Sequence, residues 1–522
     1  MAKRAQPVEA DPSPAPARSG GFDAPAALLI LALACAHLAL ALHVPPAPDE
    51  CYYWEWSRRP ALGYYDQGPM IAWLIWLGRA LAGDTPLGLR LPSIVAAALS
   101  NVLVYAIARR MAGPGAGRLA VLMLSATPLA MAGGFMATYD VPLALCWLGC
   151  IWFSLLTVEG GQRRHWAALG VCFGLGMLSK HTMALYPLCL LGALASWRPG
   201  RSWLTRPEPY LALALGLAVY APNLAWQHGH GWATVRHLAH LSGAVSDSTA
   251  VRRIGDLLGS QAGVLTPLLF LGMLWASIRA TGKGRAVGGF AWPLVAAVSW
   301  PVLAFFILMA ARSKVQANWP LCAWLSLAPA YAALVVRSGG RARGFAATAV
   351  TVAALLSLLI ALPRQRVQAG IRIPWKWDQT RKMQGGPQIA AAVQAVRREM
   401  GRSGRRVAVA GTTYDAAARL AFYLPDQPRT VCLFLGTRIN AYTDWNAEGG
   451  LTPGSDAVVL DGLPAWDPNH PKLQRIFRRV EMVRKPILVM YEGVYPDPVD
   501  TLYIYKCYGY RPDPRYETPT SG

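Results

Sequence analysis

Long apolar runs separated by short clusters of charge dominate this sequence and limit what it can fold into. Of its 522 residues, 54% are hydrophobic and only 15% are charged. A helix that crosses a bilayer needs about 20 apolar residues, and the chain supplies runs of that order many times over. This pattern predicts a polytopic α-helical membrane protein.

The apolar runs divide into about eleven predicted membrane-spanning helices within residues 22–364. A shorter run, 68–83, contains Pro69 and Arg79 and is predicted to be a juxtamembrane helix in a first outer loop at 44–87. Residues 1–21 are predicted to form a disordered cytoplasmic tail. The predicted spans lie at 25–43, 88–108, 117–135, 140–158, 166–179, 182–197, 208–224, 262–278, 289–311, 319–336 and 344–362.

The distribution of charge predicts the orientation of these spans. The net charge of +22 is compatible with a nucleic-acid partner, but the cations lie mostly in short loops, where the positive-inside bias explains them without one. The surplus of cations also suits contacts with anionic membrane lipids. This bias places the N-terminus in the cytoplasm and everything after residue 362 outside. The basic loops contain Arg109, Arg163, Arg201, Lys283 and Arg337, and the opposite loops contain Asp49, Glu50, Glu55, Asp66 and Asp140.

The tail at 365–522 differs in character from the rest of the chain. Charge, Pro and Gly become more frequent, and the run 414–424 has helical spacing between two β-like runs. A strand, helix, strand order predicts a small extracytoplasmic α/β domain. A disulfide between Cys432 and Cys507 is one alternative for this part of the chain. The predicted strands lie at 407–411, 430–435, 457–460, 487–491 and 502–510.

Polar side chains recur at the predicted outer ends of the spans. A carboxylate can remove a proton from an attacking hydroxyl, while fixed cations stabilise the charge that grows on a leaving phosphate. If the bundle brings these groups together, we expect one cavity that holds the headgroup of a lipid phosphate. The groups are Asp49 and Glu50 after the first span, Tyr139 and Asp140 at the fourth, Lys180 and His181 after the fifth, and Arg312, Lys314, Gln316 and Asn318 before the tenth.

Each of these groups also has a purely structural alternative. Asp140 can cap the N-terminus of its helix, Lys180 can extend to the membrane interface, and Arg312 and Lys314 can be solvated loop charges. The histidines of the predicted outer loop 225–261 have the spacing of a metal site, but no acidic residue lies close to them. A divalent metal is therefore not predicted.

Several motifs in this order resemble glycosyltransferase family 39, which includes protein O-mannosyltransferases and the bacterial transferases that add aminoarabinose or galacturonic acid to lipid A. The resemblance covers nearly the whole chain and is most specific at 45–100 and 130–190. It rests on the acidic pair followed by YYDQGP and on TYDVP, SKHT, QANWP, TYDAAARLAFYLPDQP and RINAYTDW.

The resemblance implies a catalytic transmembrane domain with the GT-C fold in the bacterial inner membrane. The implied reaction is inverting transfer of one sugar from a polyprenyl-phosphate donor to a lipid, glycan or protein acceptor, without a nucleotide sugar. Asp49 is implied as the base with Glu50 beside it, Asp140 as a support for base or acceptor, and Lys180 as the donor-phosphate ligand.

The sequence departs from the family pattern at Gln67, where some members carry a lysine implied to contact the donor phosphate. Contacts with the phosphate would then shift to Lys180, with His181 and Arg312 as further donor-site residues. The remaining candidates for the substrate cavity are Tyr53, Tyr65, Gln67, Tyr139 and Asn318.

Two other classes of protein remain as alternatives. A transporter or flippase of a lipid-linked sugar also needs many spans and a polar cavity, but such proteins often contain repeats with paired broken helices, and no convincing repeat is evident here. A membrane scaffold whose outer domain binds a partner would leave the charged residues at membrane depth unexplained.

Overall fold

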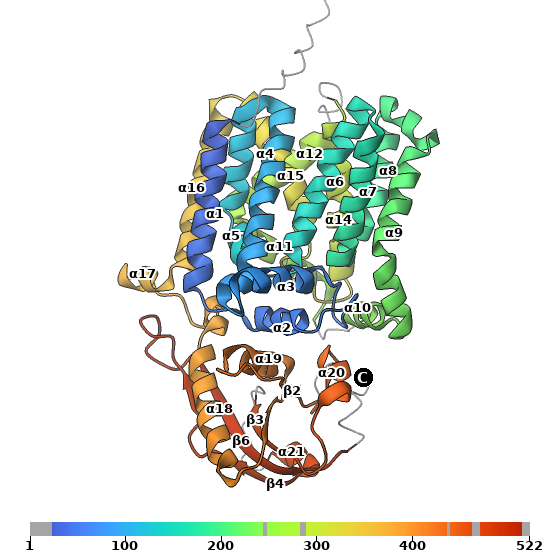
Figure 1. Ribbon diagram of the computed structural model, residues 1–522. Helices are drawn as coiled ribbons and strands as arrows, with labels where there is room; N and C mark the ends of the chain where they lie inside the picture. The colour runs from blue at the N-terminus through green and yellow to red at the C-terminus, as the bar shows by residue number, and fades with distance from the viewer. Residues whose placement is uncertain (1–22, 244–247, 282–288, 436–438, 462–469, 514–522) are drawn as a thin grey trace, which may run out of the picture.

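The computed structural model describes residues 23–243, 248–281, 289–435, 439–461 and 470–513. The predicted disordered tail at 1–21 lies outside these ranges. Figure 1 shows a bundle of long helices joined at one end to a smaller part that contains a β-sheet. Two short helices, α2 (Pro48–Ser57) and α3 (Met70–Ala82), lie across the end of the bundle that faces the sheet.

All eleven predicted spans fall on helices of this bundle. Six helices among the described residues are long and apolar enough to cross a membrane, or seven if the bent pair α11 and α12 is one span. The count of eleven therefore stays a prediction. The bundle helices are α1 (Ala24–His43), α4 (Pro86–Ser125), α5 (Pro128–Phe135), α6 (Asp140–Gly160), α7 (Arg163–Ser179), α8 (Tyr186–Ser196), α9 (Glu208–Gly229), α11 (Ala250–Leu265), α12 (Pro267–Thr281), α14 (Ala291–Ala310), α15 (Leu321–Arg337) and α16 (Gly340–Ala361).

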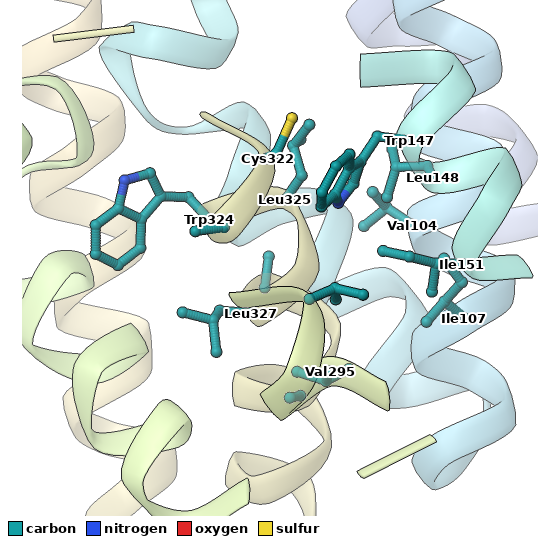
Figure 2. Packing of buried hydrophobic residues seen from close by; sticks show 14 of the residues in the cluster. Val104, Ile107, Trp147, Leu148, Ile151, Val295, Cys322, Trp324, Leu325 and Leu327 are labelled. Atoms are coloured by element: carbon teal, nitrogen blue, oxygen red, sulfur yellow. The ribbon is translucent and has the colours of Figure 1, made fainter. Parts of the chain in front are cut away.

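The centre of the bundle is a continuous apolar core between α4, α6, α14 and α15 (Figure 2). Trp147 is completely buried there, and its indole Nε1 donates a hydrogen bond of 2.9 Å to Oγ of Ser326. A buried indole N–H needs such a partner because no water is available to it. The helices that flank the site are thus held by packing at membrane depth.

Helix α4 consists of two arms that fold back on each other. Ala112 and Gly113 leave the helical conformation, and Gly113 has a φ of +82°, which glycine tolerates best. A Cβ atom on Gly117 would lie only 2.6 Å from the ring of Tyr105, so the second arm packs closely against the first. The prediction of one helix at 117–135 is wrong, because this stretch is divided at Thr127, whose side chain caps α5.

A buried ion pair fixes the start of α2. Nε and Nη2 of Arg90 donate to the two carboxylate oxygens of Glu50 at 2.7 and 2.6 Å, and both side chains are fully buried. Glu50 also accepts from the backbone N–H groups of Ala47 and Ala137, each at 2.9 Å. Arg90 donates further to the carbonyl oxygens that follow α1, including that of Val44 at 2.6 Å. The pair thus joins α1, α2, α4 and the segment before α6.

The predicted outer loop at 225–261 is largely helical in the structure. It contains α10 (Ala233–Gly243) and most of α11, which meets α12 at an angle of 107°. Thr266, at the corner, has a positive φ of 69°. The side chains that face the bundle from this region include Leu257 and Gln261, which are buried. This loop therefore forms part of the wall around the end of the bundle.

The tail forms a six-stranded mixed sheet in the order β2-β1-β3-β6-β4, with β5 paired to β6. The five predicted strands and the predicted helix are found, whereas β4 and the amphipathic helix α18 (Gly386–Met400) were not predicted. β4 escaped prediction because half of its residues are charged. The elements are β1 (Val407–Gly411), α19 (Tyr414–Tyr423), β2 (Val431–Cys432), α20 (Tyr442–Gly449), β3 (Asp456–Asp461), α21 (Pro471–Ile476), β4 (Phe477–Met482), β5 (Ile487–Val489) and β6 (Asp500–Tyr510).

The sheet order excludes the alternative of a disulfide between Cys432 and Cys507. Cys432 ends β2 and Cys507 lies in β6, with β1 and β3 between them. Neighbouring strands are about 4.8 Å apart, so three spacings put the two residues at least about 14 Å apart, well beyond the reach of a disulfide. Both thiols are free and buried.

The tail and the first outer loop share one hydrophobic core. Trp54 of α2 packs edge-on against Phe422 of α19, with ring centroids 5.2 Å apart. Tyr52 stacks against Tyr442 at 6.0 Å, and Nη2 of Arg58 donates to the carbonyl of Gln427 at 2.8 Å. The division into a transmembrane part and a tail near residue 364 stays a prediction, but the two parts pack directly on each other.

The pair between Arg90 and Glu50 leads to a stability prediction. Arg90→Met should reduce the free energy of unfolding by about 3–5 kcal/mol, because it leaves a buried carboxylate without its partner. Arg110→Met, in the same helix, removes a partly exposed pair with Glu159 and should cost about 1 kcal/mol or less. Denaturant titration of both purified variants measures the difference, and equal losses would contradict the prediction.

Candidate active site

The two adjacent acids of α2 point in different directions. Successive residues of a helix do not share a face, so only one of two neighbouring carboxylates can face a given cavity. Glu50 turns into the protein, where four donors already occupy its oxygens. Asp49 is exposed, and its Oδ1 accepts a hydrogen bond of 3.1 Å from the hydroxyl of Tyr414. The predicted pair therefore separates into one structural and one accessible acid.

Asp140 and Lys180 form the second part of the site. Nζ of Lys180 donates to Oδ1 of Asp140 at 2.7 Å, and the amide of Asn318 donates to Oδ2 at 2.5 Å. Asp140 is 8% and Lys180 6% exposed. The N-cap of α6 is Tyr139 rather than Asp140, and it makes no side-chain capping bond. Three segments that are distant in sequence thus converge on the carboxylate of Asp140.

Two tyrosines connect these parts of the site. The rings of Tyr53 and Tyr139 meet edge-on with centroids 5.7 Å apart, and Nζ of Lys180 lies 5.1 Å from the centroid of the Tyr139 ring. The charges of Asp49 and Asp140 both act on the hydroxyl of Tyr139. Burial, reinforced by Tyr139 and Asp49, raises the pKa of Tyr53 well above its usual value. Tyr53 therefore keeps its proton near neutral pH and can serve as a donor.

Asp66 is an acid of the site whose role the sequence interpretation missed. It is 7% exposed, accepts a hydrogen bond of 2.6 Å from the hydroxyl of Tyr52, and lies 3.8 Å from Nε2 of His237. Its charge also acts on the hydroxyls of Tyr53 and Tyr139. From the sequence alone, Asp66 is only one of several acids in the outer loops. Its position directly after two tyrosines could have identified it as a candidate site residue.

Two of the predicted cavity residues, Tyr65 and Gln67, flank Asp66 in the sequence and lie in the same part of the structure. Gln67 is 8% exposed, and within the described part of the chain its Oε1 has no hydrogen-bond partner. Tyr65 is half-buried, and its ring centroid is 5.2 Å from that of His237. A buried carboxamide oxygen that makes no bond is costly, so Gln67 is suited to accept a hydrogen bond from a bound group.

The structure does not join His181 and Arg312 to the pair of Asp140 and Lys180 through any contact among the described residues. Nε2 of His181 lies 3.1 Å from the hydroxyl of Tyr220. Arg312 is exposed in the turn after α14, and the end of that helix is held by Arg253, which donates to the carbonyls of Ala310 and Ala311. Their predicted roles in phosphate binding stay predictions.

A largely apolar cavity of about 180 Å³ opens beside Asp140. Asp140 and Asn318 contribute polar groups to it, and α4, α5, α6 and α15 form its apolar walls. Such a cavity suits a molecule with a hydrocarbon part and a polar end. Its residues include His37, Asn101, Leu124, Leu129, Gly134, Val141, Ala144 and Leu325.

Comparisons with known proteins show what this chain is similar to. A family model described as dolichyl-phosphate-mannose-protein mannosyltransferase matches residues 66–226, a range that contains Asp140 and Lys180. The chain is 29% identical over 284 residues to the lipid A galacturonosyltransferase RgtD of Rhizobium johnstonii. The match covers 53% of this chain and 58% of RgtD. It is 31% identical over 192 residues to undecaprenyl phosphate-alpha-4-amino-4-deoxy-L-arabinose arabinosyl transferase 1 of Pseudomonas fluorescens. That match covers 33% of this chain and 34% of the transferase.

The match therefore spans about a third to somewhat more than half of these curated relatives. Both are named as transferases, so they do not support the alternative of a transporter or flippase. Among solved structures, ArnT from Cupriavidus metallidurans bound to undecaprenyl phosphate superimposes with a TM-score of 0.61 at 14% identity, covering 92% of this chain and 97% of ArnT. The chain thus has an ArnT-like GT-C fold, and its resemblance to glycosyltransferase family 39 is confirmed.

Proposed function

We propose that this protein, with the GT-C fold and motifs of glycosyltransferase family 39, transfers one sugar with inversion from a polyprenyl-phosphate donor to an acceptor at the outer face of the bacterial inner membrane. One observation carries the proposal: the accessible carboxylate of Asp49 and the Asp140 partner of buried Lys180 both act on the hydroxyl of Tyr139, and an apolar cavity opens beside Asp140. The names of the relatives favour lipid A as the acceptor and undecaprenyl phosphate as the carrier.

Asp49 is the proposed general base. The acceptor hydroxyl attacks C1 of the sugar from the face opposite the phosphate, and Asp49 takes the hydroxyl proton. The bond between C1 and the phosphate oxygen breaks, its electron pair stays on that oxygen, and polyprenyl phosphate leaves. Attack on the opposite face inverts the configuration at C1. General-base help of this kind is worth about 10²- to 10⁴-fold in rate.

Lys180 is the proposed ligand of the donor phosphate. An ammonium group carries three donors, and Asp140 accepts one of them at 2.7 Å. Since Asn318 also binds Asp140, the lysine is held in place before the donor arrives. A preorganised cation in a buried site stabilises a departing phosphate oxygen more strongly than it would in water. Asp140 is therefore proposed to orient Lys180 rather than to take a proton.

Tyr53 and Gln67 are proposed to contact the sugar. Tyr53 remains protonated because burial raises the pKa of its hydroxyl, and Oε1 of Gln67 is available to a sugar hydroxyl within the described part of the chain. Aromatic rings such as that of Tyr139 also provide an apolar face for a sugar ring. Glu50 is proposed to hold α2 through Arg90 and to take no part in proton transfer.

Orientation in the membrane is part of the proposal. The basic alternate loops and an odd number of crossings support a cytoplasmic N-terminus and a periplasmic tail. Alkaline phosphatase fused after residue 513 should be active, and green fluorescent protein at the same position should be dark, because the first folds only in the periplasm and the second only in the cytoplasm. The reverse pattern would place the site on the cytoplasmic face.

Asp49→Asn tests the assignment of the base. We expect transfer to fall by at least about 10²-fold, because the amide cannot accept the proton, while binding of undecaprenyl phosphate is retained. Purified protein is incubated with lipid A and, in parallel, with undecaprenyl-phosphate-linked 4-amino-4-deoxy-L-arabinose or galacturonic acid, and products are measured by mass spectrometry. Asp426→Asn, at a partly exposed pair with Arg397, is the control. Full activity in Asp49→Asn would exclude this base.

Lys180→Met tests the phosphate site. The affinity for undecaprenyl phosphate should fall about tenfold to a hundredfold, because a charge-assisted hydrogen bond to the phosphate is lost. Lys314→Met removes an exposed lysine from the turn before α15 and should leave the affinity unchanged. Thermophoresis in detergent measures both affinities. Equal affinities in wild type and Lys180→Met would contradict the assignment.

A further inference from the structure

The tail contributes a side chain directly to the accessible acid of the site. Tyr414, the first residue of α19, donates a hydrogen bond of 3.1 Å from its hydroxyl to Oδ1 of Asp49. The two residues are 365 positions apart in the chain. The hydroxyl of Tyr414 also lies close enough to affect Tyr53 electrostatically. The contact therefore links the tail to the accessible acid and, through it, to Tyr53.

The surroundings of Tyr414 hold its hydroxyl in place. Thr413 caps α19, its Oγ1 accepting from the N–H of Ala416 at 3.4 Å. The Tyr414 ring packs against that of Tyr52 with centroids 4.8 Å apart. At the other end of α19, the hydroxyl of Tyr423 donates to the carbonyl of Pro46, just before α2, at 3.4 Å. Helix α19 is thus attached at both ends to the segment that carries Asp49.

The apolar face of α19 completes this attachment. Ala417, Ala418 and Ala421 belong to the same buried cluster as Trp54 and Trp56 of α2. Alanine side chains allow the two helices to approach closely. The close packing of α19 on α2 thus keeps Tyr414, the first residue of α19, within reach of Asp49.

We infer that Tyr414 is a positioning residue for Asp49, and that the sheet-containing tail is in this way part of the active site. The effect of Tyr414 on the rate of transfer rests on the proposed function. A carboxylate with one oxygen held by a phenol has fewer rotamers, so it stays in one orientation relative to the acceptor hydroxyl. The same hydrogen bond stabilises the ionised form, which is the form that accepts a proton.

The kinetic test compares Tyr414→Phe with Tyr423→Phe. Both variants remove one hydroxyl from the same helix, but only the first removes a donor to a carboxylate. In Tyr414→Phe, kcat/KM should fall about threefold to tenfold, and the acidic limb of its pH profile should move up by about half a unit to one unit. In Tyr423→Phe the acidic limb of the pH profile should coincide with that of wild type. If the acidic limbs of Tyr414→Phe and wild type coincide, the inference is overturned.

A second measurement does not depend on sugar transfer. Carbodiimides react with protonated carboxyl groups, and Asp49 is exposed enough to be labelled. The pH dependence of its labelling with a carbodiimide and glycine ethyl ester is measured by peptide mass spectrometry in full-length wild type and both variants. Labelling of Asp49 should extend to higher pH only in Tyr414→Phe. If it does so while wild type transfers no sugar, the contact is confirmed and the proposed reaction fails. If all three curves coincide, the inference fails.

Discussion

The buried ion pair of Glu50 and Arg90 is the interaction on which the site depends. It lies where α1 ends, α2 begins and α4 passes, and every oxygen of Glu50 is engaged by it or by backbone N–H groups. Two charges at such a place are tolerated only when each is fully paired and hydrogen-bonded. By fixing the direction of Glu50, the pair also fixes that of Asp49, which points about 100° away around the helix. Of the two adjacent acids, one is buried and holds the helix, and the other is exposed.

The ion pair of Asp140 and Lys180 differs from that of Glu50 and Arg90 in how many hydrogen-bond donors of its cation remain for a ligand. Arg90 uses its guanidinium fully on Glu50 and on carbonyl oxygens, which makes a rigid joint. Lys180 has a single ammonium, of which Asp140 accepts one hydrogen bond, and Asp140 lines an apolar cavity. A lysine ammonium is a compact charge with three donors, so two of them are not used on Asp140. The chemical difference between the two cations therefore matches a structural joint in one case and the proposed binding role in the other.

The tail has a closer relation to the bundle than a separate outer domain would have. Its helix α19 packs against α2, alanine and aromatic side chains of the tail share one core with the first outer loop, and Tyr414 reaches Asp49. Part of the proposed site is thus built from residues at opposite ends of the chain. Movement of the tail relative to the bundle would change the surroundings of Asp49, so the two parts are coupled through α19.

The sequence by itself determined the class of the protein and predicted candidate residues for its site. Apolar runs of bilayer length must form helices because lipid offers no partner to the backbone, so all eleven predicted segments fall on helices. Ionisable residues next to such runs had to be paired or functional, which singled out Asp49, Asp140 and Lys180. Only the tertiary structure decided that Glu50 is buried in an ion pair with Arg90, that Asp66 contacts Tyr52 and His237, that Cys432 and Cys507 are unbridged, and that Tyr414 contacts Asp49. These outcomes depend on side-chain direction and on contacts between distant segments, which hydrophobic periodicity does not encode.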